Sequence, residues 1–366
     1  MVIRWIMKGW IRAALWFRFR QISIVFHAPI PTDECAIIAG SHQNAILDSL
    51  TLATWSPKVP FTLSRGALFH NRLARWFLAS LRMFPIYRFR DGFGRMRKNA
   101  EVFEGFVEVL RKNGWLLIFP EGSHLLRYTL RPLQKGTARI AFAAQVTEGW
   151  VREIPIIPVG LQYESHTTFG SRLLIQFGPP VSSLAFKSAH SRNPKEAERA
   201  LSARLFEGIE RLLIVLPKED EAYERVLKRW NRNKGRFPNL MDQFRSDERL
   251  LDEQRQLSEE AGPPAGPDPK KSGWRKLAGY ALSFPGLVLH LPAILVALAW
   301  ERVVVRDVDL VPAARFAAGI LLVPPWYVVA LGLWHVQARS LPLGLLLLVL
   351  MPSSLWLWSR CWHWTR

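Results

Sequence analysis

The chain has 366 residues, with 49 lysines and arginines against 30 aspartates and glutamates, so its formal net charge is +19. So basic a chain suits either nucleic acid or an anionic membrane surface. The sequence contains no zinc-finger spacing and no RNA-binding aromatic signature, which leaves the nucleic-acid interpretation little support. Its two cysteines, Cys35 and Cys361, are too few for a disulfide framework. Tryptophans and arginines interleaved beside long apolar segments favour a membrane.

Residues 1–20 are predicted to form an interfacial amphipathic helix. Arg4, Lys8 and Arg12 recur every four residues, which places them along one helical face, and tryptophans and aliphatic residues fill much of the rest. The segment lacks the continuous apolar core and the cleavage site of a signal peptide. A basic, tryptophan-rich helix of this kind lies in the headgroup plane. The alternative is a helix that packs on the domain with its charges in water.

Residues 21–217 alternate short apolar runs with amphipathic segments, which predicts an α/β domain with a mixed β-sheet flanked by helices. The strand pattern in residues 154–163 contains Pro155 and Pro158, which favours an edge strand or a bulge. The expected strands are Ile22–His27, Ala36–Gly40, Phe61–Ser64, Trp115–Phe119, Ile154–Tyr163 and Leu173–Phe177. The expected helices lie near 44–55, 67–81, 95–112, 137–147 and 193–215.

Residues 218–273 are predicted to be a charged linker, because residues 218–261 are densely charged and residues 262–273 are rich in proline and glycine. Residues 274–366 are predicted to be a membrane region with three apolar segments, at roughly 278–300, 311–334 and 341–359.

The positive-inside bias decides between two arrangements of these segments. If all three cross and the α/β domain is cytosolic, Arg302, Arg306, Arg360 and Arg366 lie outside, against the bias. The preferred arrangement is therefore a re-entrant or interfacial hairpin followed by two transmembrane helices. It places the α/β domain on the cytoplasmic face, which is that of the inner membrane if the protein is bacterial.

The strongest local signal for chemistry is the run SHQNAILD, residues 41–48, which directly follows the strand Ala36–Gly40. His42 is therefore expected at the carboxyl end of a strand, where open α/β sheets bind their ligands. A carboxylate from Asp48 would fix the tautomer of the imidazole and raise its basicity. Such a pair can deprotonate an alcohol. Taken alone, the pair is more often a helix cap or a satisfied core contact.

Three further runs carry candidate residues. Glu121, Gly122 and Ser123 follow the strand Trp115–Phe119, although proline and glycine there also suit a simple turn. Arg65 follows the strand Phe61–Ser64, and Arg88 ends the run FPIYR. Arginine is suited to bidentate recognition of phosphate, but a single arginine in so basic a chain is usually a solvated surface residue.

Taken together, these runs resemble the motifs of the glycerophospholipid acyltransferase family, typified by the 1-acylglycerol-3-phosphate acyltransferases. In that family a His-Asp motif comes first, then an arginine-bearing motif, then Phe-Pro-Glu-Gly, then a proline-containing strand. The resemblance covers about residues 20–215. It implies that His42 is the general base and that Asp48 orients it.

The same resemblance implies a set of substrate-binding residues. Arg88, Glu121 and Gly122 would bind the acceptor's glycerol-phosphate end, and Arg65 and Ser123 are further substrate-binding residues. Lys135 lies in a stretch that is similar to the family's lysine-glycine segment, and Pro158 would shape the acyl-donor side.

The chain departs from the family's pattern at two places. The usual spacing is His-x4-Asp, whereas five residues separate His42 from Asp48 here. His124 stands where the family commonly has an arginine after Glu-Gly-Ser/Thr, so a phosphate contact would need Arg127, Arg131 or Lys135 instead.

The function that the resemblance implies is transfer of a fatty acyl group from acyl-CoA or acyl carrier protein to a hydroxyl of a lysophosphatidate-type glycerol-phosphate lipid. No metal and no cofactor are expected, and the expected partners are the lipid bilayer, the acyl donor and the acceptor. One alternative is a different acceptor: glycerol-3-phosphate, another lysophospholipid or an aminolipid. Another is a non-catalytic membrane lipid-binding protein. A lipid hydrolase is disfavoured because the sequence contains no Gly-x-Ser-x-Gly.

Overall fold

The computed structural model describes residues 2–69, 71–86, 98–233, 235, 237–257, 273–304, 308–338 and 349–358. The chain divides into two compact units. The first consists of Met1–Gly9, Ile24–Gln162 and Ile175–Val215, and the second of Trp10–Ser23, Tyr163–Leu174 and Leu216–Arg366.

The framework is an eight-stranded sheet with the order β1-β7-β6-β2-β5-β3-β4, in which β8 pairs with β6. β2 pairs in parallel with β5 and β6, and β3 pairs in parallel with β4 and β5, whereas β8 is antiparallel to β6. The predicted mixed β-sheet is confirmed. The strands are β1 Phe19–Phe26, β2 Ala36–Gly40, β3 Phe61–Arg65, β4 Met83–Ile86, β5 Trp115–Ile118, β6 Pro155–Tyr163, β7 Ser171–Phe177 and β8 Val181–Ser182.

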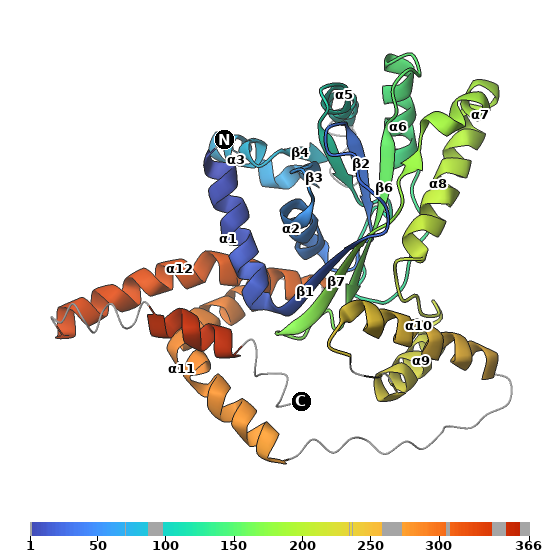
Figure 1. Ribbon diagram of the computed structural model, residues 1–366. Coiled ribbons are helices and arrows are strands. Elements are labelled where there is room, and N and C mark those ends of the chain that lie inside the picture. The colour runs from blue at the N-terminus through green and yellow to red at the C-terminus, as the bar shows by residue number, and fades with distance from the viewer. Residues whose placement is uncertain are drawn as a thin grey trace. The chain divides into compact units, whose positions relative to one another are not determined.

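Helices cover both faces of the sheet. The first unit contains α2 Ala45–Trp55, α3 Arg72–Ser80, α5 Lys98–Arg111, α6 Gly136–Thr147, α7 Lys187–Arg192 and α8 Pro194–Glu210. The connections β2-α2-β3 and β3-α3-β4 both run toward the β4 edge of the sheet. The connections β4-α5-β5 and β5-α6-β6 run in the opposite direction, toward the β1 edge. Because parallel crossovers are right-handed, α2 and α3 lie on one face and α5 and α6 on the other. Figure 1 shows α2 on one side of the strands and α6 and α8 on the other.

The periodicity of the sequence explains why these helices form where they do. α8 begins at Pro194 after Asn193, whose side chain accepts a hydrogen bond from the backbone N–H of Glu196. It buries Ala197, Leu201, Leu205 and Ile209, four residues apart, against the core. All five residues of β2 are buried, as expected for the central strand of a parallel sheet.

β6 corrects the expectation of an edge strand, because it lies inside the sheet between β7 and β2. The carbonyl of Pro158 accepts a hydrogen bond from the N–H of Gly178 at 2.9 Å, just beyond the end of β7. β8 resumes the pairing only opposite Pro155 and Ile156. Pro158 therefore lies at the break between β7 and β8, where its missing N–H costs no ladder hydrogen bond.

The second unit contains two helices within the segment predicted to be a linker, α9 Asp220–Asn233 and α10 Leu240–Leu257. Tyr223 and Trp230 of α9 are buried, as are Leu240, Phe244 and Leu251 of α10. These residues recur at helical spacing, so the high charge of the segment concealed a regular apolar stripe. Residues 258–272, which complete the predicted linker, lie outside the described residues.

A partly buried carboxylate organises part of the second unit. Glu164 forms ion pairs with Arg20 at 2.9 Å and with Arg172 at 3.1 Å, and it also accepts the backbone N–H of Arg172. Burial works to raise the pKa of Glu164, but the two guanidinium groups outweigh it and lower the pKa below its ordinary value. Arg172 also donates to Gln243 at the start of α10.

Two long apolar helices follow in the second unit, α11 Gly273–Val304 and α12 Val311–Ala338. Within them, Leu277–Arg302 and Val311–Val336 have the length and composition needed to cross a membrane. α11 continues through Pro285 and Pro292, so the reversal of the chain expected at these prolines is not found. A short apolar helix, Val349–Trp358, lies in the third predicted segment, whose residues 339–348 lie outside the described residues.

α1 Val2–Arg18 coincides with the predicted amphipathic helix. Trp5 is 70% exposed and Ile6 is also exposed. Further along the helix, Leu15 is buried and Trp16 stacks on Trp356 of the second unit. Exposed tryptophan on a basic helix is typical of interfacial segments, but contact of α1 with lipid stays a prediction.

Candidate active site

The parallel strands bring the two strongest motifs to one edge of the sheet. Ala39 of β2 is in register with Ile118 of β5, so the segments that follow these two strands both leave from the carboxyl edge. Gly40 allows this close approach. A Cβ atom there would lie 2.7 Å from Leu52 Cδ1 and 3.1 Å from Phe119 Cε1. His42 and Glu121 meet at this edge, although they are far apart in the sequence.

His42 and Asp48 form the expected pair. Nδ1 of His42 lies 3.0 Å from Oδ2 of Asp48, and the Asp48 side chain is fully buried. A carboxylate can only accept, so Nδ1 carries the proton and donates it, which leaves Nε2 with a lone pair. The imidazole is therefore held in the tautomer that a general base requires.

Asp48 also holds the start of α2. Its Oδ2 accepts the backbone N–H of Asn44 at 2.6 Å, within the first turn of the helix. Ala45, between these residues, has φ +47°, a left-handed conformation that is uncommon outside glycine. The left-handed residue turns the chain sharply, so that five intervening residues still bring Asp48 back to His42. This accounts for the longer spacing between the two residues.

Glu121 ties the two motifs together. Its Oε1 accepts the backbone N–H of His42 at 2.7 Å, and its Oε2 accepts the backbone N–H of Arg131 at 3.2 Å and Nε of the same residue at 3.3 Å. Its side chain is 2% exposed. Burial raises the pKa of Glu121 above its ordinary value, and the three donors oppose that shift. Glu121 therefore positions the loop that carries His42.

Arg131 is the functional candidate that the sequence pattern indicated least directly. Besides its contacts with Glu121, its Nη1 donates to Ser123 Oγ at 2.6 Å. Its Nη2 is buried and has no hydrogen-bond partner in the described part of the chain. The guanidinium group of Arg131 therefore lies beside the motif at 120–123, which is followed in this chain by His124. The only signal in the sequence that pointed to Arg131 was His124, which stands where the family commonly has an arginine.

Aromatic rings set the position of the imidazole. The ring of His42 stacks on Phe119, with the centroids 4.1 Å apart and the planes inclined at 18°. His124 approaches edge-on, with its centroid 5.6 Å from that of His42. The backbone N–H of Leu125 donates to the carbonyl of His42 at 3.4 Å. These contacts leave the His42 side chain 15% exposed.

The amino end of α6 lies beside the same motif. The N–H of Gln134 donates to the carbonyl of Pro120 at 2.7 Å, and α6 begins two residues later, with Lys135 as its N-cap. Gly122 has φ +75° and lies against Gln134, so both a left-handed conformation and a close approach favour glycine there. Thr137, in the first turn, has a buried hydroxyl without a hydrogen-bond partner among the described residues. A helix amino terminus attracts anions.

The remaining predicted residues are placed as follows. Arg65 ends β3 at the same edge, but its side chain lies outside the described part, and Arg88 lies outside it altogether. Pro158 is buried in β6, with its ring directed at Gly178 and Gly208. The structure therefore brings together His42, Asp48, Glu121, Gly122 and Ser123. Lys135 directly follows Gln134, whose N–H bonds the carbonyl of Pro120 in the same motif. The roles assigned to all of them stay predictions.

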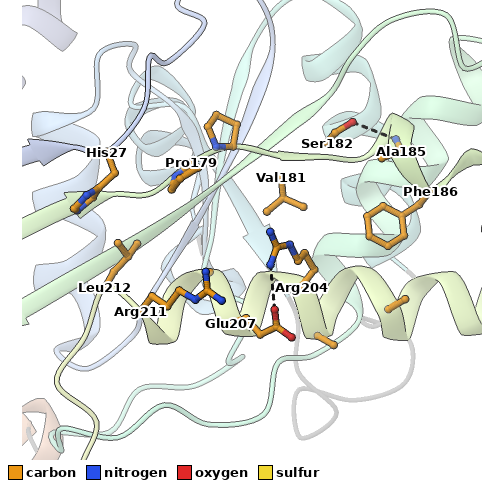
Figure 2. A pocket seen from close by; sticks show the side chains of 14 residues that line it. His27, Pro179, Val181, Ser182, Ala185, Phe186, Arg204, Glu207, Arg211 and Leu212 are labelled. Atoms are coloured by element: carbon orange, nitrogen blue, oxygen red, sulfur yellow. Dashed lines mark hydrogen bonds and ion pairs between the residues drawn. The ribbon is translucent and has the colours of Figure 1, made fainter. Parts of the chain in front are cut away.

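A separate groove of about 790 Å³ runs along α8 (Figure 2). Figure 2 shows Arg204 and Glu207 paired on the helix, with Val181 and Phe186 on the opposite side and His27 at one end. None of the predicted site residues lines this groove.

Comparison with known proteins concerns the first half of the chain. Residues 21–162 match the model of the acyltransferase family. The chain is 25% identical over 129 residues to glycerol-3-phosphate O-acyltransferase 2 of Saccharomyces cerevisiae, a match that covers 35% of this chain and 17% of that protein. The chain thus spans less than a fifth of the length of this relative.

A solved structure is also similar, that of the 1-acyl-sn-glycerophosphate (LPA) acyltransferase PlsC from Thermotoga maritima. The TM-score is 0.39 and the sequence identity is 16%, over 56% of this chain and 79% of that chain.

Proposed function

We propose that this chain is an acyltransferase that acylates a hydroxyl of a lysophosphatidate-type glycerol-phosphate lipid, and the match of residues 21–162 to the acyltransferase family supports the proposal. The observation that carries the proposal is the His42–Asp48 pair, tied through Glu121 to the loop after β5. The acyl donor is acyl-CoA or acyl carrier protein, and the reaction uses no metal and no cofactor held by the enzyme.

His42 is the general base of the proposed mechanism. Nε2 removes the proton of the acceptor hydroxyl while that oxygen attacks the carbonyl carbon of the acyl thioester. The tetrahedral intermediate collapses by breaking the carbon–sulfur bond, and the thiolate leaves with the proton that His42 had taken. The carboxylate of Asp48 stabilises the imidazolium formed between these two steps, because it lies 3.0 Å from Nδ1.

The acceptor's phosphate is proposed to bind between Arg131 and the amino end of α6. Arg131 has an unused guanidinium nitrogen, and the buried hydroxyl of Thr137 has no partner among the described residues. Lys135 adds a positive charge at the same helix start. Arg131, Thr137 and Lys135 thus supply three kinds of donor near this motif, a combination that suits a phosphate monoester. Arg65 and Arg88 are proposed to complete this site.

Membrane attachment belongs to the same proposal. The lengths of Leu277–Arg302 and Val311–Val336 support spanning helices, and exposed tryptophans on α1 support an interfacial contact. The catalytic domain is proposed to lie on the cytoplasmic face, where Arg275 and Lys276 directly precede the first of these helices.

The decisive experiment is acyl transfer from labelled acyl-CoA or acyl carrier protein to lysophosphatidate, with the wild type and His42→Ala in the same membranes. We expect the rate to fall by roughly 10²–10⁴-fold in the variant, the usual contribution of a general base. His190→Ala is the matched control, since His190 packs on Phe142 and Trp150 at the far end of α6. A His42→Ala rate close to that of the wild type would remove His42 from the chemistry.

A second candidate function keeps the reaction and changes the acceptor. His124 stands where the family has an arginine, so in the proposed site Arg131 supplies the contact with the acceptor's phosphate. If acceptor binding does not need this contact, an acceptor with a different headgroup would fit. Parallel assays with glycerol-3-phosphate, other lysophospholipids and an aminolipid decide between the acceptors. A preference for an acceptor without a phosphate monoester would contradict the proposed phosphate site.

A further inference from the structure

An unusual charge pattern surrounds α3. The sequence contains no aspartate or glutamate between Asp48 and Asp91. Lysine and arginine recur throughout that stretch, at positions 58, 65, 72, 75, 82, 88 and 90. So long a stretch of one charge sign is not needed for folding, and it indicates a surface that meets an anionic partner.

α3 concentrates this charge on one exposed face. Arg72, Arg75, Trp76 and Ala79 lie at positions i, i+3, i+4 and i+7, and all four are exposed. Trp76 is 61% exposed. Among the described residues, no carboxylate pairs with Arg72 or Arg75. A largely exposed tryptophan beside two arginines is costly in water and is the composition of a membrane-interface anchor.

The topology places this face close to the candidate active site. α3 connects the parallel strands β3 and β4, so it starts at the carboxyl edge of the sheet, the edge that carries His42. Right-handed crossovers place α3 on the same face as α2. Ile46, in the first turn of α2, is 42% exposed at that edge. An apolar residue beside the catalytic loop and a basic, tryptophan-bearing helix therefore share one face of the sheet.

We propose that the exposed face of α3 docks the catalytic unit on an anionic lipid surface. Trp76 enters the headgroup region, and Arg72 and Arg75 contact lipid phosphates. The docking itself is independent of the proposed function. Its consequence rests on that function: an acceptor lipid reaches the carboxyl edge and His42 without leaving the bilayer.

A lipid surface fits this face better than an acidic protein. A stable protein interface buries about 800 Å² on each partner, which one exposed face of a nine-residue helix does not supply. An interfacial anchor needs only an aromatic ring and neighbouring positive charges.

The test uses the full chain in proteoliposomes that contain phosphatidylglycerol, with a fluorophore on a single introduced cysteine. Cys361 is replaced by alanine, and Cys35 is buried and stays. Labels on Trp76→Cys and Ala79→Cys are compared with a label on Ala200→Cys. Ala200 is exposed on α8, which lies on the other face of the sheet (Figure 1). We expect lipid-borne quenchers to act on positions 76 and 79, and iodide in water to act on position 200.

The charge dependence supplies a second measurement. With the label at position 79, Arg72→Ala with Arg75→Ala should lower the docking equilibrium constant roughly 25-fold in anionic vesicles, about fivefold for each arginine. The same pair of substitutions should change little in phosphatidylcholine vesicles. If lipid quenching at positions 76 and 79 equals that at position 200, the inference is overturned. Protection of these labels by a soluble acidic protein instead of lipid would overturn it as well.

An activity measurement separates this inference from the proposed function. Trp76→Ala should raise KM for a long-chain acceptor in vesicles severalfold and leave the rate with a short-chain, water-soluble acceptor unchanged. If no acceptor is acylated by the wild type, the proposed function fails, while the quenching result still decides the docking. If acylation is normal and position 76 stays in water, the docking fails and the function stands.

Discussion

The backbone N–H of His42 donates a hydrogen bond to Oε1 of Glu121 at 2.7 Å, across 79 residues of sequence. The second oxygen of the same carboxylate holds Arg131. A single buried side chain thus fixes the distance between the proposed base and the proposed phosphate-binding arginine. Since Glu121 bonds the backbone of His42 and not its ring, it acts on position and not on proton transfer.

Glu121→Gln should therefore lower both stability and activity. An amide has one oxygen and one NH₂ group, so the NH₂ must face either the N–H of His42 or the donors of Arg131. We expect a loss of about 1–3 kcal/mol in the free energy of unfolding, the cost of an unpaired buried donor. Thermal unfolding of the purified protein measures it, with the exposed Glu210→Gln as control. An unchanged melting temperature would contradict the proposed tie.

Asp48→Asn should reduce activity more than it reduces stability. The amide oxygen still accepts from Nδ1 of His42 and from the N–H of Asn44, so the loop and the start of α2 are kept. The negative charge that stabilises the imidazolium is lost, and kcat/KM should fall roughly 10²–10⁴-fold. Kinetics with lysophosphatidate check this, beside Asp242→Asn on α10, whose carboxylate is 54% exposed. Equal rates for Asp48→Asn and the wild type would show that Asp48 is a helix cap only.

Ala45 offers a test of the longer spacing between His42 and Asp48. At φ +47° a β-branched side chain is strongly disfavoured, whereas glycine adopts that conformation freely. Ala45→Val should destabilise the protein by about 1–3 kcal/mol and reduce activity. Ala45→Gly should stay within about 1 kcal/mol of the wild type, because relief of strain offsets the greater chain entropy of glycine. Unfolding curves of both variants decide the matter, and equal stabilities would mean that Ala45 does not adopt a left-handed conformation.

Glu164 should give the stability a measurable pH dependence. Arg20 and Arg172 lower its pKa in the folded state below the unfolded value, even though burial opposes them. The stabilisation is therefore fully present above the unfolded pKa, which is about 4.3, and is lost as the pH falls through the folded pKa. Glu164→Gln should cost about 1–3 kcal/mol at pH 7, and the difference from the wild type should shrink below pH 4. A difference that is independent of pH would contradict the ion-pair explanation.

The sequence alone predicted the α/β domain, its mixed sheet and the motif residues around His42 and Glu121. It could do so because buried strands leave continuous apolar runs, and motif residues follow those runs directly. The apolar stripe of α9 and α10 was also present in the sequence, but dense charge concealed it. α11 continues through Pro285 and Pro292 and packs against α12. Neighbouring helices can satisfy the backbone groups that a proline leaves free, and no local signal in the sequence describes such packing.

Only the tertiary structure decided which residues meet. The parallel register of β2 and β5 brings His42 to Glu121, and the loop that follows returns Arg131 to the same carboxylate. No periodicity encodes such contacts, because they depend on strand order and on the path of a long loop. Strand order is also what the sequence lacked at Pro158, where the proline predicted an edge strand or a bulge. Its interior place follows from the gap between β7 and β8, which exists only once the sheet has assembled.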